Sequence, residues 1–314
     1  MMAAAAAAAQ VSDPIAELIT TYHELNSSVV EELAEEPSPL EFMRYVARNT
    51  PFVVRGGARD WQATKTWNVE YLTQFLRDHS VNVAVTPLGN ADAPTLDERG
   101  NSVFAKPHEE DQPFQDFIEY LTKQETDPNF QGSETRYAQT QNDNLRHEYR
   151  TLFSQVQRSV PFARIALQQD PDAINLWIGN ARSVTALHRD NYENVYVQVA
   201  GRKHFVLLPP LCQPCVHERA LRPAHYARRS RPRQEEDQDQ DQIKGDNDDD
   251  DDSSSSNSNS SDLELIMEED ADDVPFATWD PDNDQVNATK YSHLATPMRV
   301  TLEPGDMFYL PAMW

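Results

Sequence analysis

The chain has 314 residues, of which 39% are hydrophobic, so it can bury a sizeable core in one large or two small domains. Its formal net charge is −25, but residues 234–273 carry −17 of this, which leaves −8 for the rest. The acidity therefore describes one segment and says little about a site elsewhere. No apolar run approaches the roughly 18 residues of a membrane-spanning helix, so we expect no membrane partner.

Two further compositional features bear on location. Residues 1–11 are rich in alanine and lack the basic start of a secretory signal, so we expect a disordered, low-complexity start. Only two cysteines occur, which is typical of a reducing compartment and predicts a cytoplasmic protein, with the nucleus as an alternative. An Arg-rich patch at residues 228–233 is neutralised by the acidic run that follows it, which disfavours a nucleic-acid partner.

The N-terminal part, residues 12–172, alternates helical and extended patterns. The second predicted helix begins at Ser38, with Pro39 as its first residue, and its spacing predicts that Leu40, Met43 and Val46 are buried. The predicted helices cover residues 12–34, 38 onward, 69–77 and 113–122, and the predicted strands cover 51–57, 81–86 and 137–140.

The C-terminal part, residues 173–314, consists of short apolar runs between Gly and Pro turns. The predicted strands cover residues 174–178, 183–187, 192–199, 203–208, 296–303 and 306–314. We expect 192–199 and 203–208 to pair as a hairpin across Gly201. This pattern favours a mainly β fold of the sandwich or jelly-roll type, with an N-terminal α/β region. Residues 228–273 are expected to be a disordered acidic insert within one domain, residues 12–314.

The most informative motif is His188 with Asp190, two residues apart after an apolar run. A lone His beside a strand is more often structural than functional. A carboxylate at this spacing changes that expectation, because both side chains can reach one metal from a strand end. Together they supply two of the three ligands of a 2-His-1-carboxylate site for non-haem Fe(II).

A polar face follows this motif. With a period of two, Asn194, Tyr196 and Gln198 share one face of an otherwise apolar strand, which suggests a lined cavity. On the next strand, Lys203 shares one face with Phe205 and Leu207, because these residues are two positions apart. A lysine that faces an interior needs an anionic partner.

A 2-oxoglutarate co-substrate would be such a partner, because its far carboxylate needs a cation and hydroxyl donors. Lys203, Thr185 and Tyr137 are the candidates. Thr185 and His188 are three residues apart, so a regular strand would point them to opposite faces. Both line one cavity only if the strand ends or bulges near Leu187.

These residues carry a resemblance to a known family. Residues 175–210 (NLWIGNARSVTALHRDNYENVYVQVAGRKHFVLLPP), 51–61 (PFVVRGGARDW) and 303–314 (EPGDMFYLPAMW) resemble the jumonji C (JmjC) family of cupin-type 2-oxoglutarate oxygenases. Within it, the chain is most similar to the subfamily of jumonji domain-containing protein 7. The resemblance covers most of the chain except the alanine-rich start and residues near 228–275.

The resemblance implies a double-stranded β-helix and an oxygenase site. Fe(II) would be bound by His188, Asp190 and a distal His, and 2-oxoglutarate by Lys203 and Thr185. Tyr137 would assist, Asn194 would lie behind the ligands, and Tyr196 would line the cavity. The implied activity is hydroxylation of a protein substrate, with lysyl hydroxylation of a GTP-binding protein implied by the subfamily.

The pattern departs from the family at its end. In the family, a Trp such as Trp314 is followed closely by the distal His and by further strands, and this sequence stops there. We expect a shortened copy of an active oxygenase, or alternatively a catalytically dead cupin that binds a partner. A histone lysine demethylase is a third and lower-ranked reading. A homodimer would require the missing C-terminal region.

The remaining motif is Cys212 with Cys215, which has the spacing of a zinc half-site or a redox pair. A structural zinc needs two more ligands, and only His217 and His225 are near in sequence. Two unliganded loop thiols are the simpler interpretation.

Overall fold

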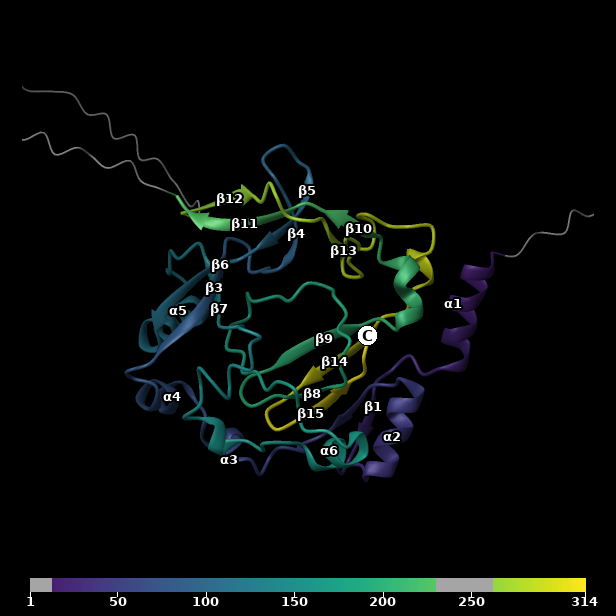
Figure 1. Cartoon of the computed structure of the whole chain (residues 1–314), viewed down its shortest axis with the longest axis horizontal. Coiled ribbons are helices and arrows are strands. Elements are labelled where there is room, and N and C mark those ends of the chain that lie inside the picture. Colours follow the sequence, from purple (N-terminus) through teal and green to yellow (C-terminus); the bar gives the residue numbers. More distant parts are fainter. Residues whose placement is uncertain (1–12, 230–261) are drawn as a thin grey trace, which may run out of the picture.

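The structure, a computed structural model, describes residues 13–229 and 262–314 (Figure 1). The expected alanine-rich start and most of the acidic insert lie outside these residues. The helices are α1 (Pro14–Leu25), α2 (Pro39–Arg48), α3 (Gln62–Thr66), α4 (Val69–Phe75), α5 (Phe114–Thr126) and α6 (Pro161–Leu167), with the 3₁₀ turns η1 (Phe153–Gln155), η2 (Pro210–Cys215) and η3 (Ser292–Leu294). The strands are β1 (Glu31–Leu33), β2 (Phe52–Val54), β3 (Ser80–Thr86), β4 (Ala93–Leu96), β5 (Ser102–Lys106), β6 (His108–Pro113), β7 (Thr135–Tyr137), β8 (Asn194–Val197), β9 (Lys203–Leu207), β10 (Glu218–Leu221), β11 (Pro223–Arg228), β12 (Leu263–Met267), β13 (Val274–Ala277), β14 (Met298–Leu302) and β15 (Met307–Leu310).

The centre of the fold is a pair of β layers that pack against each other. One layer has the strand order β1-β2-β15-β8, and the other is the antiparallel pair β14-β9. The ring of Phe205 on β9 lies 5.2 Å from that of Tyr196 on β8 and 5.1 Å from that of Phe308 on β15. These contacts form one buried cluster across both layers. The mainly β, jelly-roll type of core that the sequence predicts is confirmed.

The predicted hairpin of residues 192–199 and 203–208 is wrong. β8 pairs with β15, placing Tyr196 opposite Phe308, whereas β9 pairs with β14, placing Phe205 opposite Val300. The connection around Gly201, which has φ +64°, therefore passes from one layer to the other. Crossing between layers buries both apolar faces, which a two-stranded ribbon alone could not do.

Two other predicted strands, 174–178 and 183–187, are irregular in the structure. The first retains one bridge, between Ile178 and Ala138. The side chain of Asn144 replaces a strand partner here, because it accepts a hydrogen bond from Leu176 N at 2.7 Å and donates one to Leu176 O at 2.9 Å. In the second segment, Val184 N donates to the carbonyl oxygen of Gly89 at 2.8 Å.

Three further sheets combine strands from the N-terminal part with strands from residues 218–277. They have the strand orders β6-β3-β7, β12-β11-β5-β4 and β10-β13, and α4 and α5 bury apolar side chains against the first of them. β12 corrects the insert predicted over residues 228–273. Leu263 is 5% exposed and pairs with Arg228, so the ordered sheet resumes at residue 263, whereas the predicted insert extends to residue 273.

The first helix is shorter than its predicted range of 12–34. Its N-cap is Asp13, whose carboxylate accepts a hydrogen bond from Ile15 N at 3.1 Å; Ser12, the expected cap, lies outside the described residues. At the other end, the side chain of Asn26 donates to Tyr22 O at 2.9 Å. This bond competes with continued helix formation. β1 then begins at Glu31 and pairs in parallel with β2.

The second helix presents a different face from the one predicted. Leu40 and Met43 are 70% and 37% exposed, whereas Phe42 is fully buried and Val46 packs partly buried against the same cluster, as predicted. Phe42 packs its ring against Phe52 of β2 and Tyr309 of β15. Burying one aromatic ring removes more apolar surface from water than either aliphatic side chain would, which decides the orientation of the helix.

Candidate functional site

His188 and Asp190 face each other in the irregular segment before β8. The Nε2 atom of His188 lies 3.6 Å from Oδ2 of Asp190, and the side chains are 42% and 52% exposed. The Nδ1 atom of His188 lies 2.8 Å from the carbonyl oxygen of Ala186. Since a carbonyl only accepts hydrogen bonds, Nδ1 carries the proton and Nε2 is the nitrogen that a neutral ring offers to a metal.

The pair also tunes its own protonation. The neighbouring carboxylate of Asp190 raises the pKa of His188, and the His188 ring lowers the pKa of Asp190. Within residues 13–229 and 262–314, no third His, Cys, Asp or Glu joins them as a metal ligand set. The backbone of the last residues nevertheless lies alongside, because Met313 N donates to the carbonyl oxygen of Asp190 at 2.7 Å.

Lys203 and Tyr137 form the second part of the candidate site. Nζ of Lys203 lies 3.3 Å from the hydroxyl oxygen of Tyr137 and 5.5 Å from the centroid of its ring. Tyr137 is 9% exposed and Lys203 is half-buried. In the part of the chain that the structure describes, no carboxylate pairs with this ammonium group. A half-buried cation beside a hydroxyl group, without an anion, fits the far carboxylate of a dicarboxylic co-substrate.

The other predicted residues have more local environments. Thr185 is exposed on the irregular segment, so the strand alternation that would separate it from His188 does not apply. Asn194 donates a side-chain hydrogen bond to Tyr192 O at 3.3 Å. Tyr196 lies between the layers and stacks on Trp177, with ring centroids 5.8 Å apart and planes 15° apart.

A tight turn links the two parts of the site. A Cβ atom on Gly179 would lie 2.6 Å from Cδ2 of Tyr137 and 2.7 Å from Oγ of Ser183, so only glycine fits there. On the other side, Gly89 approaches the carbonyl oxygen of Arg182 closely. The segment that leads to His188 is therefore held by backbone packing.

Sequence reasoning missed Asp92 and Trp177. Burial and the neighbouring Glu109 raise the pKa of Asp92, and the Asp92 carboxylate in turn raises the pKa of His188. Asp92 lines a hollow of about 340 Å³. The other lining residues are Lys106, Pro107, His108, Glu109, His225 and Tyr226. No motif marks Asp92, because its neighbours come from distant parts of the chain.

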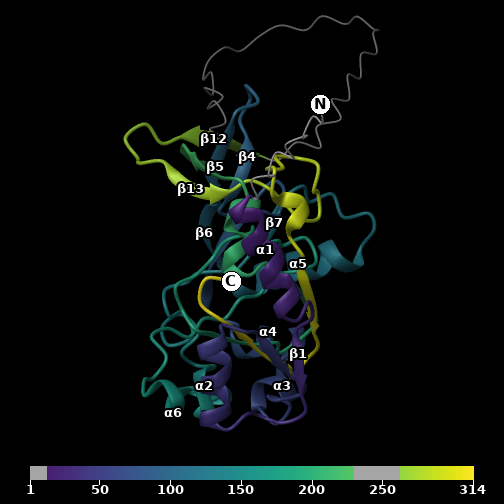
Figure 2. The same ribbon diagram turned by 90° about the vertical axis from the view of Figure 1, so that its right-hand side faces the viewer.

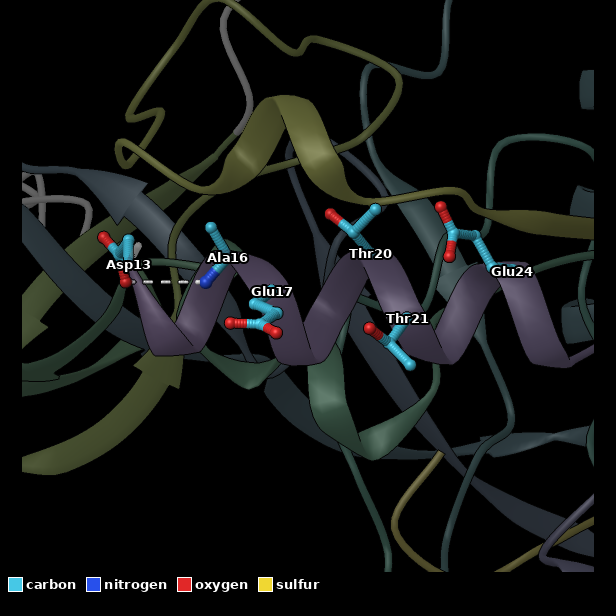
Figure 3. A pocket seen from close by; sticks show the side chains of 6 residues that line it. All are labelled: Asp13, Ala16, Glu17, Thr20, Thr21 and Glu24. Atoms are coloured by element: carbon cyan, nitrogen blue, oxygen red, sulfur yellow. Dashed lines mark hydrogen bonds between the residues drawn. The ribbon is translucent and has the colours of Figure 1, made fainter. Parts of the chain in front are cut away.

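A larger hollow, about 550 Å³, runs along the outer face of α1 (Figure 3). Its six lining residues all come from that one helix, between Asp13 and Glu24. Figure 3 shows them side by side along the helix, without convergence on a common point. We assign this surface no chemical role.

With this geometry described, comparison with known proteins identifies the class. Residues 37–314 match the family described as "Cupin-like domain". The chain belongs to this family and, within it, to the JmjC proteins. This is a family of oxygenases whose members generally depend on iron and 2-oxoglutarate, and the fold of the chain fits that class.

Three relatives illustrate the membership. The human "Bifunctional peptidase and (3S)-lysyl hydroxylase JMJD7" is 32% identical over 90% of this chain and 77% of its own. The "JmjC domain-containing protein E" of Dictyostelium discoideum is 30% identical over 90% and 76%. The "Lysine-specific demethylase JMJ32" of Arabidopsis thaliana is 30% identical over 91% and 75%.

In the described part of the chain, no helix combines the length and apolar character that a membrane span requires.

Proposed function

We propose that this chain is an Fe(II)- and 2-oxoglutarate-dependent hydroxylase of lysine side chains in a protein substrate. The observation that carries the proposal is the half-buried ammonium of Lys203 beside the hydroxyl of Tyr137. The facing pair of His188 and Asp190 supplies metal ligands in the same fold. When bound, iron with 2-oxoglutarate would supply oxidising power from dioxygen.

Each residue has a defined task under this proposal. His188 would bind the metal through Nε2, with its ring held by the bond from Nδ1 to Ala186, and Asp190 would bind through its carboxylate. Lys203 would pair with the far carboxylate of 2-oxoglutarate, and the Tyr137 hydroxyl would donate to the same group. Thr185 and Asn194 stay candidates for the rim of this site.

The choice of lysine rests on the relatives and on charge. The human relative is named a lysyl hydroxylase and the Arabidopsis relative a lysine-specific demethylase. Asp92 acts electrostatically on His188, so its carboxylate would attract a cationic target side chain to the metal. A GTP-binding protein as the target follows from the family resemblance alone.

The test is turnover with defined variants. The chain would be incubated with Fe(II), 2-oxoglutarate, dioxygen and lysine-containing peptides, and succinate and peptide mass would be measured. Hydroxylation adds one oxygen atom to a peptide, whereas demethylation removes a methyl group, which separates the two relatives' named activities. His188→Ala, Asp190→Ala and Lys203→Ala should lose turnover. His204→Ala is the matched control. The side chain of His204 lies on the face of β9 opposite to that of Lys203, and its ring bonds to Thr301 of β14.

A second candidate function is a cupin that binds a partner without catalysis. It is favoured by one observation: within the described residues, only His188 and Asp190 gather as metal ligands. Under this reading, wild type and His188→Ala consume 2-oxoglutarate equally slowly. Formation of succinate by the wild type but not by His188→Ala would exclude this second function.

A further inference from the structure

Cys212 and Cys215 form a closed environment that the proposed oxygenase does not use. Both lie on η2, and they are 1% and 0% exposed. The Sγ atom of Cys215 donates to the carbonyl oxygen of Tyr291 at 3.3 Å, and Sγ of Cys212 lies 3.6 Å from Nε2 of His23. Both cysteines lie in one buried cluster. The structure thus brings together two thiols and one imidazole from segments that are distant in sequence.

The helical geometry suits a bond between these sulfurs. Side chains three residues apart eclipse each other in a 3₁₀ helix, and three steps of about 2 Å place the Cα atoms about 6 Å apart. Disulfides span Cα separations of about 4.4–6.8 Å. Formation of the disulfide therefore requires rotation of the two side chains more than displacement of the backbone.

The first helix covers this dithiol. Figure 2 shows α1 on the face of the molecule that is turned to the viewer, and Ile19 packs in one cluster with both cysteines and Trp279. Asp13 fastens the start of the helix, because its carboxylate accepts from Lys290 Nζ at 2.9 Å and from the Tyr291 hydroxyl at 3.0 Å. The dithiol is therefore shielded by a helix that is held at its first residue.

We propose that Cys212 and Cys215 are a reversible dithiol–disulfide site, oxidised by hydrogen peroxide or a similar small peroxide. The Cys215 thiol loses its proton, and the thiolate attacks one peroxide oxygen, which forms a sulfenic acid and releases hydroxide that takes up this proton as water. The Cys212 sulfur then attacks the Cys215 sulfur and expels its oxygen as water. The proton of Cys212 passes through Nε2 of His23 to the departing hydroxide. In total, two thiols and one peroxide give one disulfide and two waters.

The order of attack follows from the electrostatics of the pair. The neighbouring thiol of Cys212 lowers the pKa of Cys215, and the neighbouring Cys215 raises the pKa of Cys212. The thiolate is the nucleophile, so Cys215 reacts first. His23 is only half-buried and connects Cys212 to solvent. The proposal does not depend on iron or 2-oxoglutarate.

The experiment benefits from the cysteine content, because these are the only two in all 314 residues. The reduced chain would be exposed to hydrogen peroxide, unfolded with iodoacetamide and weighed by mass spectrometry. We expect both alkylation sites to disappear together and to return after treatment with dithiothreitol. Irreversible oxidation of one cysteine, or no oxidation over a time in which the unfolded chain is fully oxidised, would overturn the proposal.

Variants test the assigned roles, with folding checked by circular dichroism. In Cys212→Ser, the remaining Cys215 should form a sulfenic acid that dimedone traps. In Cys215→Ser, Cys212 should react at least tenfold more slowly, and equal rates would refute Cys215 as the nucleophile. His23→Gln should accumulate the dimedone adduct of Cys215, and an unchanged yield would refute the proton path. Should the serine variants fail to fold, the wild-type result and His23→Gln still decide.

A last variant tests whether α1 shields the dithiol from peroxide. Asp13→Ala removes both the cap of α1 and its bonds to Lys290 and Tyr291, so oxidation should accelerate about fivefold, as the loss of an N-cap would allow. Asp60→Ala is the control, because its ion pair with Lys65 is exposed and lies elsewhere. An unchanged rate in Asp13→Ala would show that α1 does not shield the dithiol.

Discussion

The ammonium group of Lys203 donates a hydrogen bond to the hydroxyl oxygen of Tyr137 at 3.3 Å, although 66 residues separate them. This contact connects β9 of the central layers to β7 of the N-terminal sheet. It places a cation beside a hydroxyl group at the junction of two sheets. The co-substrate proposal depends on this contact more than on any single residue.

Tyr137→Phe tests the contact directly. The variant keeps the buried ring and removes one donor, so 2-oxoglutarate should bind about 10- to 100-fold more weakly, as expected for one hydrogen bond to a charged group. Calorimetric titration with 2-oxoglutarate in anaerobic Fe(II) solution would measure this. Tyr192→Phe is the control, because its side chain is 61% exposed. An equal affinity in both variants would remove Tyr137 from the site.

Gly89 supports the segment that carries His188. Gly89 has φ +80°, and a Cβ atom there would lie 2.0 Å from the carbonyl oxygen of Arg182. Gly89→Ala should therefore displace residues 182–184 and weaken binding of Mn²⁺, a stand-in for Fe(II), at His188 and Asp190. Electron paramagnetic resonance titration of Mn²⁺ would measure the change.

Gly100→Ala is the matched control for this substitution. Gly100 has φ +79°, but a Cβ atom there meets nothing within 4 Å. Both variants bear the backbone cost of a left-handed conformation, about 1–2 kcal/mol. A loss of stability and Mn²⁺ affinity beyond that of Gly100→Ala isolates the clash with Arg182. Identical behaviour of the two variants would contradict the prediction.

Part of this site could be predicted because strand periodicity is local. The alternation of Lys203 with Phe205 and Leu207 places all three on one face, and Phe205 indeed packs between the layers. Which strand pairs with which is not local. β8 and β9 pair with β15 and β14, about a hundred residues away. The local pattern of two strands joined by a short turn therefore predicted a hairpin that the structure does not form.

The irregular segments could not be predicted for a related reason. Residues 174–178 have the apolar pattern of a strand, but the Asn144 side chain supplies the hydrogen bonds that a neighbouring strand would make. The effect of Asp92 on the pKa of His188 could not be predicted either, because it depends on tertiary packing. A side chain that replaces a backbone partner leaves no periodic signal in the sequence.

The contact between the two β layers should dominate stability. Phe308 is fully buried and packs against Phe205 at 5.1 Å between ring centroids. Phe308→Ala should lower the free energy of unfolding by about 3–5 kcal/mol through lost burial and a cavity. Urea denaturation followed by circular dichroism would measure it, with Leu88→Ala as control because Leu88 is 69% exposed. A cost below that of an exposed substitution would argue against packed layers.

Asp306 is a buried carboxylate that ties β15 to the loop after β2. It is 4% exposed and accepts hydrogen bonds from Gly56 N at 2.9 Å, Glu303 N at 3.0 Å and Arg55 Nη1 at 2.5 Å. Burial raises its pKa, but these donors outweigh burial, so the pKa of Asp306 lies below its ordinary value of 3.8. Asp306→Asn should cost about 1.5–3 kcal/mol at pH 7, the range for hydrogen bonds to a charged group.

The pH dependence of this cost follows from the sign of the shift. A depressed folded-state pKa stabilises the protein above the unfolded pKa, and that contribution disappears as pH falls through the folded value. The difference in unfolding free energy between wild type and Asp306→Asn should therefore be constant above about pH 5 and shrink below about pH 4. Urea titrations from pH 3 to 7 would show this, with Asp60→Asn as the exposed control. A difference that stays constant down to pH 3 would mean that the charge of Asp306 does not stabilise the fold.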